Sequence, residues 1–187
     1  MVKKCEKNCE TVWKEKKLAS DNYMDICFDA IPENEGFARV VVAAFMAQLD
    51  PLLEEVDDVK TAVSEAVTNC IIHGYGYGDY NKEKRLEEYS LQKENDTKEN
   101  DTKENENRMV HIECFRCQNE LYVLIEDTGI GIDDVKQAME PLFTTKPDME
   151  RSGMGFAFME AFMDELCVES QKNMGTKVYM SKRIGEK

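Results

Sequence analysis

The segment between residues 56 and 73 constrains the fold most strongly, because apolar side chains recur in it every three or four residues. This spacing places them on one side of an α-helix, and a stripe so wide has to be covered by another element. Gly74 predicts the end of the helix. We therefore expect a long helix packed against a sheet, with its stripe formed by Val59, Ala62, Val63, Ala66, Val67, Cys70 and Ile71.

The rest of the chain predicts the strands of that sheet and further helices. Gln118 and Asn119 separate two strand-like runs, as in a β-hairpin. The expected order is a strand at 23–31, a helix at 34–49, the long helix, strands at 109–117 and 120–127, helices at 133–138 and 156–162, and strands at 164–170 and 175–182. This order predicts an α/β, two-layer sandwich with a mixed, mostly antiparallel sheet and helices on one face.

Two stretches are expected to lie outside the core of the domain at 23–183. Residues 1–22 are rich in Lys and Glu, which predicts a loosely ordered N-terminal extension. The string KENDT occurs at 93–97 and again at 98–102. Low-complexity sequence of this kind cannot bury a core, so we expect a disordered insertion at about 81–108.

The net charge and the apolar runs of the chain indicate which kinds of partner it can bind. A formal net charge of -14 argues against direct nucleic-acid binding, which needs a basic patch, and suits basic protein partners or simple solubility. No apolar run is long enough to span a bilayer, and no apolar segment follows the basic start of the chain. We therefore expect a cytoplasmic protein without a membrane partner.

The seven cysteines are expected to be reduced thiols in that compartment. Cys114 and Cys117 form a CxxC motif, but no second pair accompanies it and only His111 lies nearby. A zinc site needs four ligands, so we do not expect these cysteines to hold a metal.

Glu65 and Asn69 lie four residues apart on the long helix and therefore share a face. As an isolated pair they suit a solvated outer surface. The same pair also suits a metal–phosphate site, because an Asn oxygen can bind Mg²⁺ and a Glu can orient or deprotonate a nucleophile.

A glycine motif follows the strand at 120–127. Asp127 is followed by Gly129 and Gly131, which let the backbone pass close to a flat ligand. Asp127 can accept a hydrogen bond from the amino group of adenine. A plain Asp-Thr-Gly turn is the simpler alternative.

A second glycine motif precedes the helix at 156–162. Gly153 and Gly155 lead into the helix start, where free N–H groups bind phosphate, and Lys146 and Arg151 add cations upstream. The chain has neither the GxxxxGK[ST] string of a P-loop nor a GxGxxG string at this position. These glycines therefore predict a different kind of nucleotide site.

The order of these motifs resembles the GHKL ATP-binding fold of histidine-kinase catalytic domains and gyrase-type ATPases. EAVTN resembles its N box, and DTGIGI and RSGMGF resemble its two glycine boxes. With FARVVVAAFMAQLDP, VSEAVTNCIIHGYG, PLFTTKP and FMDELCVES, the chain resembles the anti-sigma F factors (stage II sporulation protein AB) of spore-forming bacteria. This resemblance covers residues 23–183 apart from the insertion.

The resemblance implies a serine protein kinase that also inhibits a sigma factor. Such a protein is a homodimer that binds ATP and Mg²⁺ and sequesters the sporulation sigma factor F. It phosphorylates a serine of the anti-anti-sigma factor, stage II sporulation protein AA.

The resemblance also implies roles for single residues. Glu65 would be the catalytic base, Asn69 the Mg²⁺ ligand and Asp127 the adenine-binding carboxylate. Arg151 would lie near the terminal phosphate, and Arg39 would contact both protein partners. The nucleotide would be lined by Gly129, Gly131, Thr145, Lys146, Gly153, Met154, Gly155 and Thr176. The stretch 141–150 would close as a lid over ATP.

Two rival functions stay open on the sequence. A histidine-kinase catalytic domain would need a phosphoacceptor helix pair, for which the first twenty residues are too short. A binding module that uses ATP only to hold its shape has no need of a catalytic base, so Glu65 argues against it.

Overall fold

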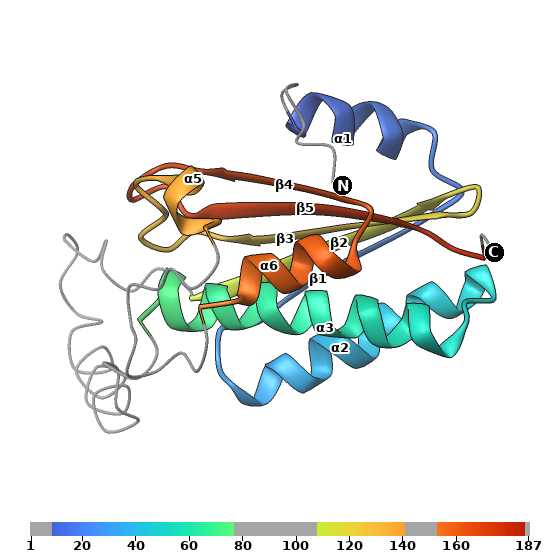
Figure 1. Ribbon diagram of the computed structural model, residues 1–187, viewed down its shortest axis with the longest axis horizontal. Helices are drawn as coiled ribbons and strands as arrows, with labels where there is room; N and C mark the ends of the chain where they lie inside the picture. Colours follow the sequence, from blue (N-terminus) through green and yellow to red (C-terminus); the bar gives the residue numbers. More distant parts are fainter. Residues whose placement is uncertain (1–8, 77–107, 141–152, 186–187) are drawn as a thin grey trace, which may run out of the picture.

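The computed structural model describes residues 9–76, 108–140 and 153–185 (Figure 1). In these ranges five strands form one sheet in the order β1-β2-β3-β5-β4. Every pairing in the described part of the chain is antiparallel. The sheet there is therefore wholly antiparallel, where the sequence predicts a mixed, mostly antiparallel sheet. The strands are β1 (Asn22–Asp29), β2 (Met109–Cys117), β3 (Glu120–Asp127), β4 (Glu165–Ser170) and β5 (Thr176–Arg183).

The predicted hairpin is confirmed: Gln118 and Asn119 join β2 to β3, with Gln118 in the left-handed region at φ 55°. The insertion expected at about 81–108 lies outside the described residues, except for Arg108. The lid expected at 141–150 lies outside them as well.

Three helices cover one face of the sheet, as the sequence predicts (Figure 1). They are α2 (Glu33–Met46), α3 (Leu53–Asn69) and α6 (Gly155–Phe162); a 3₁₀ turn at Ala47–Leu49 follows α2, and the short helix α5 (Val135–Ala138) lies between β3 and α6 in the chain. No helix in the described ranges has the length and apolar character needed to cross a bilayer.

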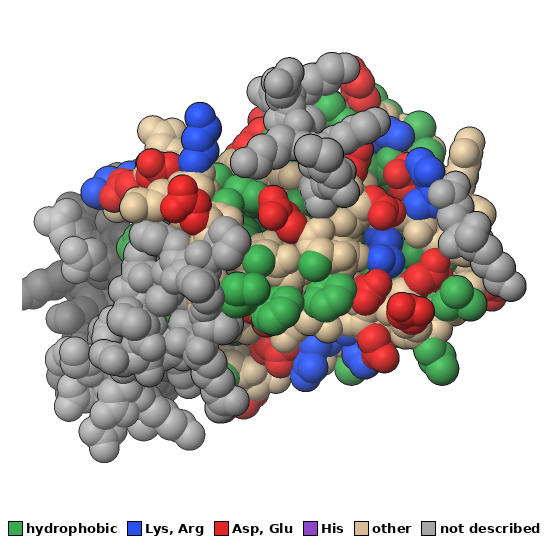
Figure 2. All heavy atoms as spheres, in the orientation of Figure 1, with side chains coloured by type: hydrophobic (Ala, Val, Ile, Leu, Met, Phe, Trp, Pro, Cys, Tyr) green, Lys and Arg blue, Asp and Glu red, His purple; other side chains and the backbone are tan. Residues whose placement is uncertain are grey.

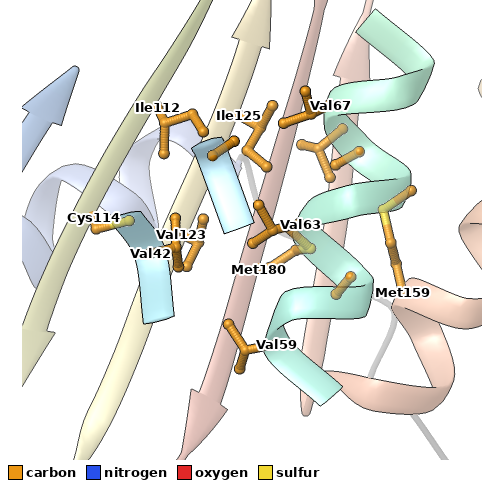
Figure 3. Packing of buried hydrophobic residues seen from close by; sticks show 14 of the residues in the cluster. Val42, Val59, Val63, Val67, Ile112, Cys114, Val123, Ile125, Met159 and Met180 are labelled. Atoms are coloured by element: carbon orange, nitrogen blue, oxygen red, sulfur yellow. The ribbon is translucent and has the colours of Figure 1, made fainter. Parts of the chain in front are cut away.

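The core lies between α3 and the inner face of the sheet (Figure 3). Every residue of the predicted α3 stripe is buried, at 2% exposure or less. Strand side chains alternate between the two faces, so every second residue of each strand meets the helices. Figure 3 shows Val63 and Val67 of α3 beside Ile125 of β3 and Met180 of β5.

The end of α3 differs from the regular helix that the apolar spacing predicts. The α-helix ends at Asn69, and Cys70–Gly74 form a π-helical turn closed by a hydrogen bond from Tyr75 N to Cys70 O (3.0 Å). Wider turns of this kind occur frequently at functional sites. Here the turn continues from Asn69 towards the end of β3.

The outer face of the sheet carries a helix that the charged N-terminal composition does not predict. Residues Cys9–Leu18 form α1 on the opposite side of the sheet from α2 and α3 (Figure 1). Trp13 of α1 is 6% exposed, and its ring centroid lies 4.7 Å from that of Phe115 and 5.4 Å from that of Tyr179. The helix is ordered because these outward-facing aromatic side chains bury Trp13, while Leu18 at its end stays exposed.

The expectation that all cysteines are reduced thiols is wrong for one pair. Cys9 of α1 and Cys167 of β4 form a disulfide, with their Cα atoms 6.4 Å apart. The two residues are 158 positions apart in the chain, so no local sequence pattern indicates this pairing. The disulfide fixes the start of α1 on the outer face.

Replacing Trp13 with alanine is expected to lower the free energy of unfolding by about 3 kcal/mol, because it removes the aromatic packing that holds α1 on the sheet. Urea denaturation followed by far-UV circular dichroism measures the loss. Lys14→Ala is the matched control on the same helix, since the Lys14 side chain is 68% exposed. Equal stability of the two variants would show that α1 does not depend on Trp13.

Candidate nucleotide site

The last turns of α3 meet the first residue of α6. A Cβ atom built on Gly155 would lie 3.1 Å from Glu65 Oε2 and 3.5 Å from both Asn69 Oδ1 and Asn69 Nδ2. Both side chains are therefore directed towards the start of α6, and neither is fully exposed. This differs from the solvated outer face that suits the isolated pair. A residue larger than glycine at position 155 would fill the space between the two helices.

The start of α6 has the form of an anion site. Gly153 has a φ of +62°, a conformation that side-chain-bearing residues rarely adopt. Met154 is the N-cap and makes no side-chain capping hydrogen bond to the helix. Its carbonyl accepts from Phe158 N (2.9 Å), and the amides before Phe158 have no acceptor within the helix, as is usual for a first turn.

Asp127 ends β3 as a buried carboxylate that is only 4% exposed. Its Oδ1 accepts a hydrogen bond from Gly129 N (2.8 Å). The Cys70 thiol and the Thr176 N–H also donate to it. Burial raises the pKa of Asp127 above its usual value, and these hydrogen bonds only partly oppose the rise.

Glycines enclose Asp127 where side chains would collide with it. A Cβ atom on Gly74 would lie 2.8 Å from Asp127 Oδ1, and one on Gly175 would lie 1.9 Å from Asp127 O. A Cβ atom on Gly129 would lie 2.1 Å from Gly74 O, which itself accepts from Ile130 N at 2.9 Å. The π-helical turn, the β3 loop and the start of β5 therefore come together around one carboxylate.

Sequence reasoning missed three residues of this enclosure: Cys70, Gly74 and Gly175. The apolar spacing accounts for Cys70 as part of the stripe, whereas its burial and its proximity to Asp127 raise the pKa of its thiol well above the usual value. The sequence predicts Gly74 only as the residue that ends the helix. Gly175 has a φ of +82°, and its place before the Thr176 motif was the one available signal.

Thr176 and Gly131 extend the enclosure on the β5 side. Thr176 pairs with Asp127 across β5 and β3, and its Oγ1 lies 3.0 Å from Ser170 Oγ. Ser170 Oγ accepts from Ile132 N (2.8 Å) and donates to Gly175 O (2.7 Å). Gly131 has a φ of +68°, and a Cβ atom there would lie 2.1 Å from Gln171 O.

The remaining predicted residues fall elsewhere. Thr145, Lys146 and Arg151 lie outside the described residues. Arg39 belongs to α2, where its Nε lies 2.8 Å from Glu35 Oε1 and its side chain is 42% exposed. Ser64 Oγ donates to the same Glu35 carboxylate, so Arg39 borders α3 without entering the enclosure around Asp127.

The groups at the start of α6 and those around Asp127 lie at the two ends of one arrangement along the end of α3. At one end, a carboxylate and an amide face a helix start, which suits a cation and phosphate groups. At the other end, glycines bring three backbone segments close to a buried carboxylate acceptor. Five residues of the chain, from Cys70 to Gly74, connect the two ends.

Comparison with known proteins identifies the family of the chain. Residues 28–182 match the histidine kinase-like ATPase domain family. The anti-sigma F factor of Clostridium perfringens is 49% identical over 88% of this chain and 98% of its own length. The anti-sigma F factor of Clostridium beijerinckii is 50% identical over 88% of this chain and 96% of its own length.

A solved structure supports the fold. The RsbU and RsbW domains of a Mycobacterium tuberculosis protein superpose with a TM-score of 0.55 at 14% identity, covering 89% of this chain. This chain spans 33% of the length of that protein. The fold is a five-stranded antiparallel sheet with three helices on one face, and two glycine motifs lie near α3. With the family match and the relatives of about half identical sequence, these observations show that the chain belongs to the anti-sigma F factor family, within the histidine kinase-like ATPase domains.

Proposed function

We propose that this protein is a cytoplasmic, homodimeric anti-sigma factor and serine protein kinase that controls sporulation transcription. It binds ATP with Mg²⁺ and sequesters the sporulation sigma factor F. It phosphorylates a serine of the anti-anti-sigma factor. The observation that carries the proposal is the approach of Glu65 and Asn69 to the start of α6, beside the glycine-enclosed Asp127.

The base of ATP fits at Asp127. Its carboxylate is fixed by the Gly129 N–H, so it can accept a further hydrogen bond from the adenine amino group without moving. Gly74, Gly129 and Gly175 bring backbone close to it. Thr176, held by Ser170 on the neighbouring strand, lines the same side.

The phosphates and Mg²⁺ fit at the start of α6. Asn69 Oδ1 offers the hard oxygen that Mg²⁺ prefers, and the free amides after Gly153 suit phosphate oxygens. We place Thr145, Lys146 and Arg151 around the phosphates as well. When bound, Mg-ATP supplies the phosphoryl group and neutralises its charge.

Glu65 acts as the general base. Its Oε2 lies beside the Cβ position of Gly155, at the same helix start, so a serine hydroxyl brought there can transfer its proton to it. The serine oxygen then attacks the terminal phosphorus, and ADP leaves. The chain's own contribution is mainly positioning, because phosphoryl transfer requires little covalent chemistry from the protein.

The partner surface lies on α2. Arg39 is part-exposed there, and Phe37 and Val40 of the same helix are 50% and 64% exposed. Figure 2 shows that hydrophobic side chains also gather over α6 within a largely charged face. Exposed apolar side chains next to an arginine, as on α2, are typical of protein–protein interfaces.

Replacing Arg39 with glutamate is expected to weaken binding of sigma factor F and of the anti-anti-sigma factor at least roughly tenfold, because a charge is reversed at the contact. Surface plasmon resonance in the presence of Mg-ATP measures both affinities. Lys60→Glu on α3 is the charge-matched control, and circular dichroism verifies folding. Unchanged affinity for both partners would remove Arg39 from the interface.

Sequestration of the sigma factor is tested by gel filtration of the two proteins with and without Mg-ATP. We expect a stable complex that is promoted by the nucleotide. If the proteins elute separately under both conditions, the anti-sigma assignment is wrong whatever the outcome of the kinase assay.

A further inference from the structure

A second group of metal-binding side chains lies on the outer face of the sheet, away from the nucleotide site. Asp25 of β1 and His111 and Glu113 of β2 each offer one ligand atom, and these atoms all lie within 4.8 Å of one another. Cys27 of β1 is a free, exposed thiol directly opposite His111 in the strand register. Opposed residues of antiparallel strands share a face, so all four side chains emerge on the same side.

We propose that Asp25, His111 and Glu113 form a binding site for a borderline divalent transition-metal ion such as Zn²⁺, with Cys27, which lies outside this close group on the same face, as a fourth ligand that reaches the ion by side-chain rotation. Zinc in proteins is bound by this set of ligand types: carboxylate oxygen, imidazole nitrogen and thiolate sulfur. Tetrahedral zinc with bonds of about 2.0–2.1 Å to oxygen and nitrogen requires ligand separations of about 3.4 Å. His111 Nε2 and Asp25 Oδ1 are 2.6 Å apart, so these two side chains have to rotate apart to admit the ion.

The surroundings of His111 favour a cation between the imidazole and Asp25. His111 Nε2 faces Asp25 Oδ1, while Nδ1 lies 3.7 Å from Glu126 Oε2. With Nδ1–H directed to Glu126, as the outer carboxylate that commonly accompanies a histidine ligand, the ring lone pair at Nε2 is on the side of Asp25 and can bind a cation there.

Both carboxylate ligands are held by groups that leave an oxygen for the ion. Glu113 Oε2 accepts from Lys17 Nζ (2.8 Å) and Trp13 Nε1 (3.3 Å), which leaves Oε1. Asp25 Oδ2 accepts from the Tyr23 hydroxyl, while Oδ1 faces His111 Nε2 at 2.6 Å, where the ion would take the place of their direct contact.

The local charge admits a divalent ion. Asp25, Glu113 and Glu126 are opposed by Lys17, on Glu113, and Lys177, whose Nζ lies 3.1 Å from Glu126 Oε1. Three negative and two positive groups leave the cluster acidic without the ion.

This site is distinct from the CxxC motif. Cys114 is fully buried on the inner face, and burial raises the pKa of its thiol. His111 points to the opposite face, three residues away on the same strand. Cys114 therefore cannot share an ion with His111.

The test is a titration of the full, nucleotide-free chain, with its Cys9–Cys167 disulfide intact, with Zn²⁺ in competition with a chromophoric chelator. We expect one high-affinity ion per chain. His111→Gln is expected to lower the affinity at least roughly tenfold, and Asp25→Asn should lower it as well. His73→Gln, which replaces the other of the two histidines, is the matched control and should bind as the wild type does.

Co²⁺ gives a second, independent readout. Its visible spectrum should show a thiolate charge-transfer band that disappears in Cys27→Ser. Trp13 is the one tryptophan of the chain and hydrogen-bonds to Glu113, so bound Co²⁺ should quench its fluorescence.

Equal affinity of wild type and His111→Gln, both folded by circular dichroism, would overturn the proposal. Absence of one-to-one binding would also overturn it, and would leave His111 as a bridge between Asp25 and Glu126. A wild-type Co²⁺ complex without a thiolate band would contradict the four-ligand set.

Discussion

Replacing Glu65 with glutamine should lower the rate of phosphate transfer to the anti-anti-sigma factor by roughly 100- to 10,000-fold, the range that general-base catalysis supplies. Glutamine keeps the size of the side chain beside Gly155 but cannot take a proton from the serine hydroxyl. The loss should appear in kcat, while the Kd for ATP and the affinity for the sigma factor stay unchanged. Transfer of label from γ-labelled ATP at saturating substrate measures it.

Glu54→Gln is the matched control for this variant. Glu54 is exposed in the first turn of α3, the helix that carries Glu65, and lies at the opposite end from Asn69. It should transfer phosphate at the wild-type rate. A Glu65→Gln protein that also transfers at that rate would eliminate Glu65 as the base.

Replacing Asp127 with asparagine should raise the Kd for ATP about 100-fold, equivalent to roughly 3 kcal/mol, because the base loses a charged acceptor and meets an amide donor. Isothermal titration calorimetry measures the change. Asp133→Asn, in the loop that follows β3, is the exposed control, with a side chain that is 69% accessible. Unchanged ATP affinity in Asp127→Asn would remove Asp127 from the nucleotide site.

The same variant should keep its stability without ATP. Burial raises the pKa of Asp127, so the folded protein binds this proton more tightly than the unfolded chain does. Stability from this group is therefore present below the unfolded pKa of about 3.9 and is lost as pH rises through the folded pKa. Removing the buried charge should flatten that decline, and urea denaturation of the two proteins at several pH values measures the difference and verifies that the variant is folded.

The helices on the inner face of the sheet could be predicted because the apolar spacing that identifies each of them lies within its own segment of the sequence. The stripe on α3 repeats at a spacing that identifies both the helix and its buried side. The π-helical turn at Cys70–Gly74 could not be predicted, because a change in hydrogen-bond register leaves the apolar spacing almost unaltered.

Helix α1 was missed for a different reason. Its charged residues hide Trp13, and the partners that order it, Phe115, Tyr122 and Tyr179, lie more than one hundred residues away in the chain. Only the folded structure shows that this segment packs on the aromatic side chains of the outer face of the sheet. The Cys9–Cys167 disulfide depends on the same long-range contact.

In the candidate site, too, residues within local motifs could be predicted and residues that matter through contacts distant in sequence could not. Glu65, Asn69, Asp127 and the glycine motifs were found from spacing and resemblance, and their roles stay predictions. Gly74 and Gly175 were missed because their importance comes from Asp127, a neighbour in space whose carboxyl group and backbone exclude a Cβ atom at both positions.

The measurement that tests the central claim most directly is phosphate transfer by the wild-type protein from Mg-ATP to the purified anti-anti-sigma factor. Mass spectrometry identifies the modified residue. We predict stoichiometric phosphorylation of one serine that requires Mg²⁺. If ATP binds and the sigma factor is sequestered but no phosphate is transferred, the kinase assignment is contradicted and the protein is an ATP-dependent binding module.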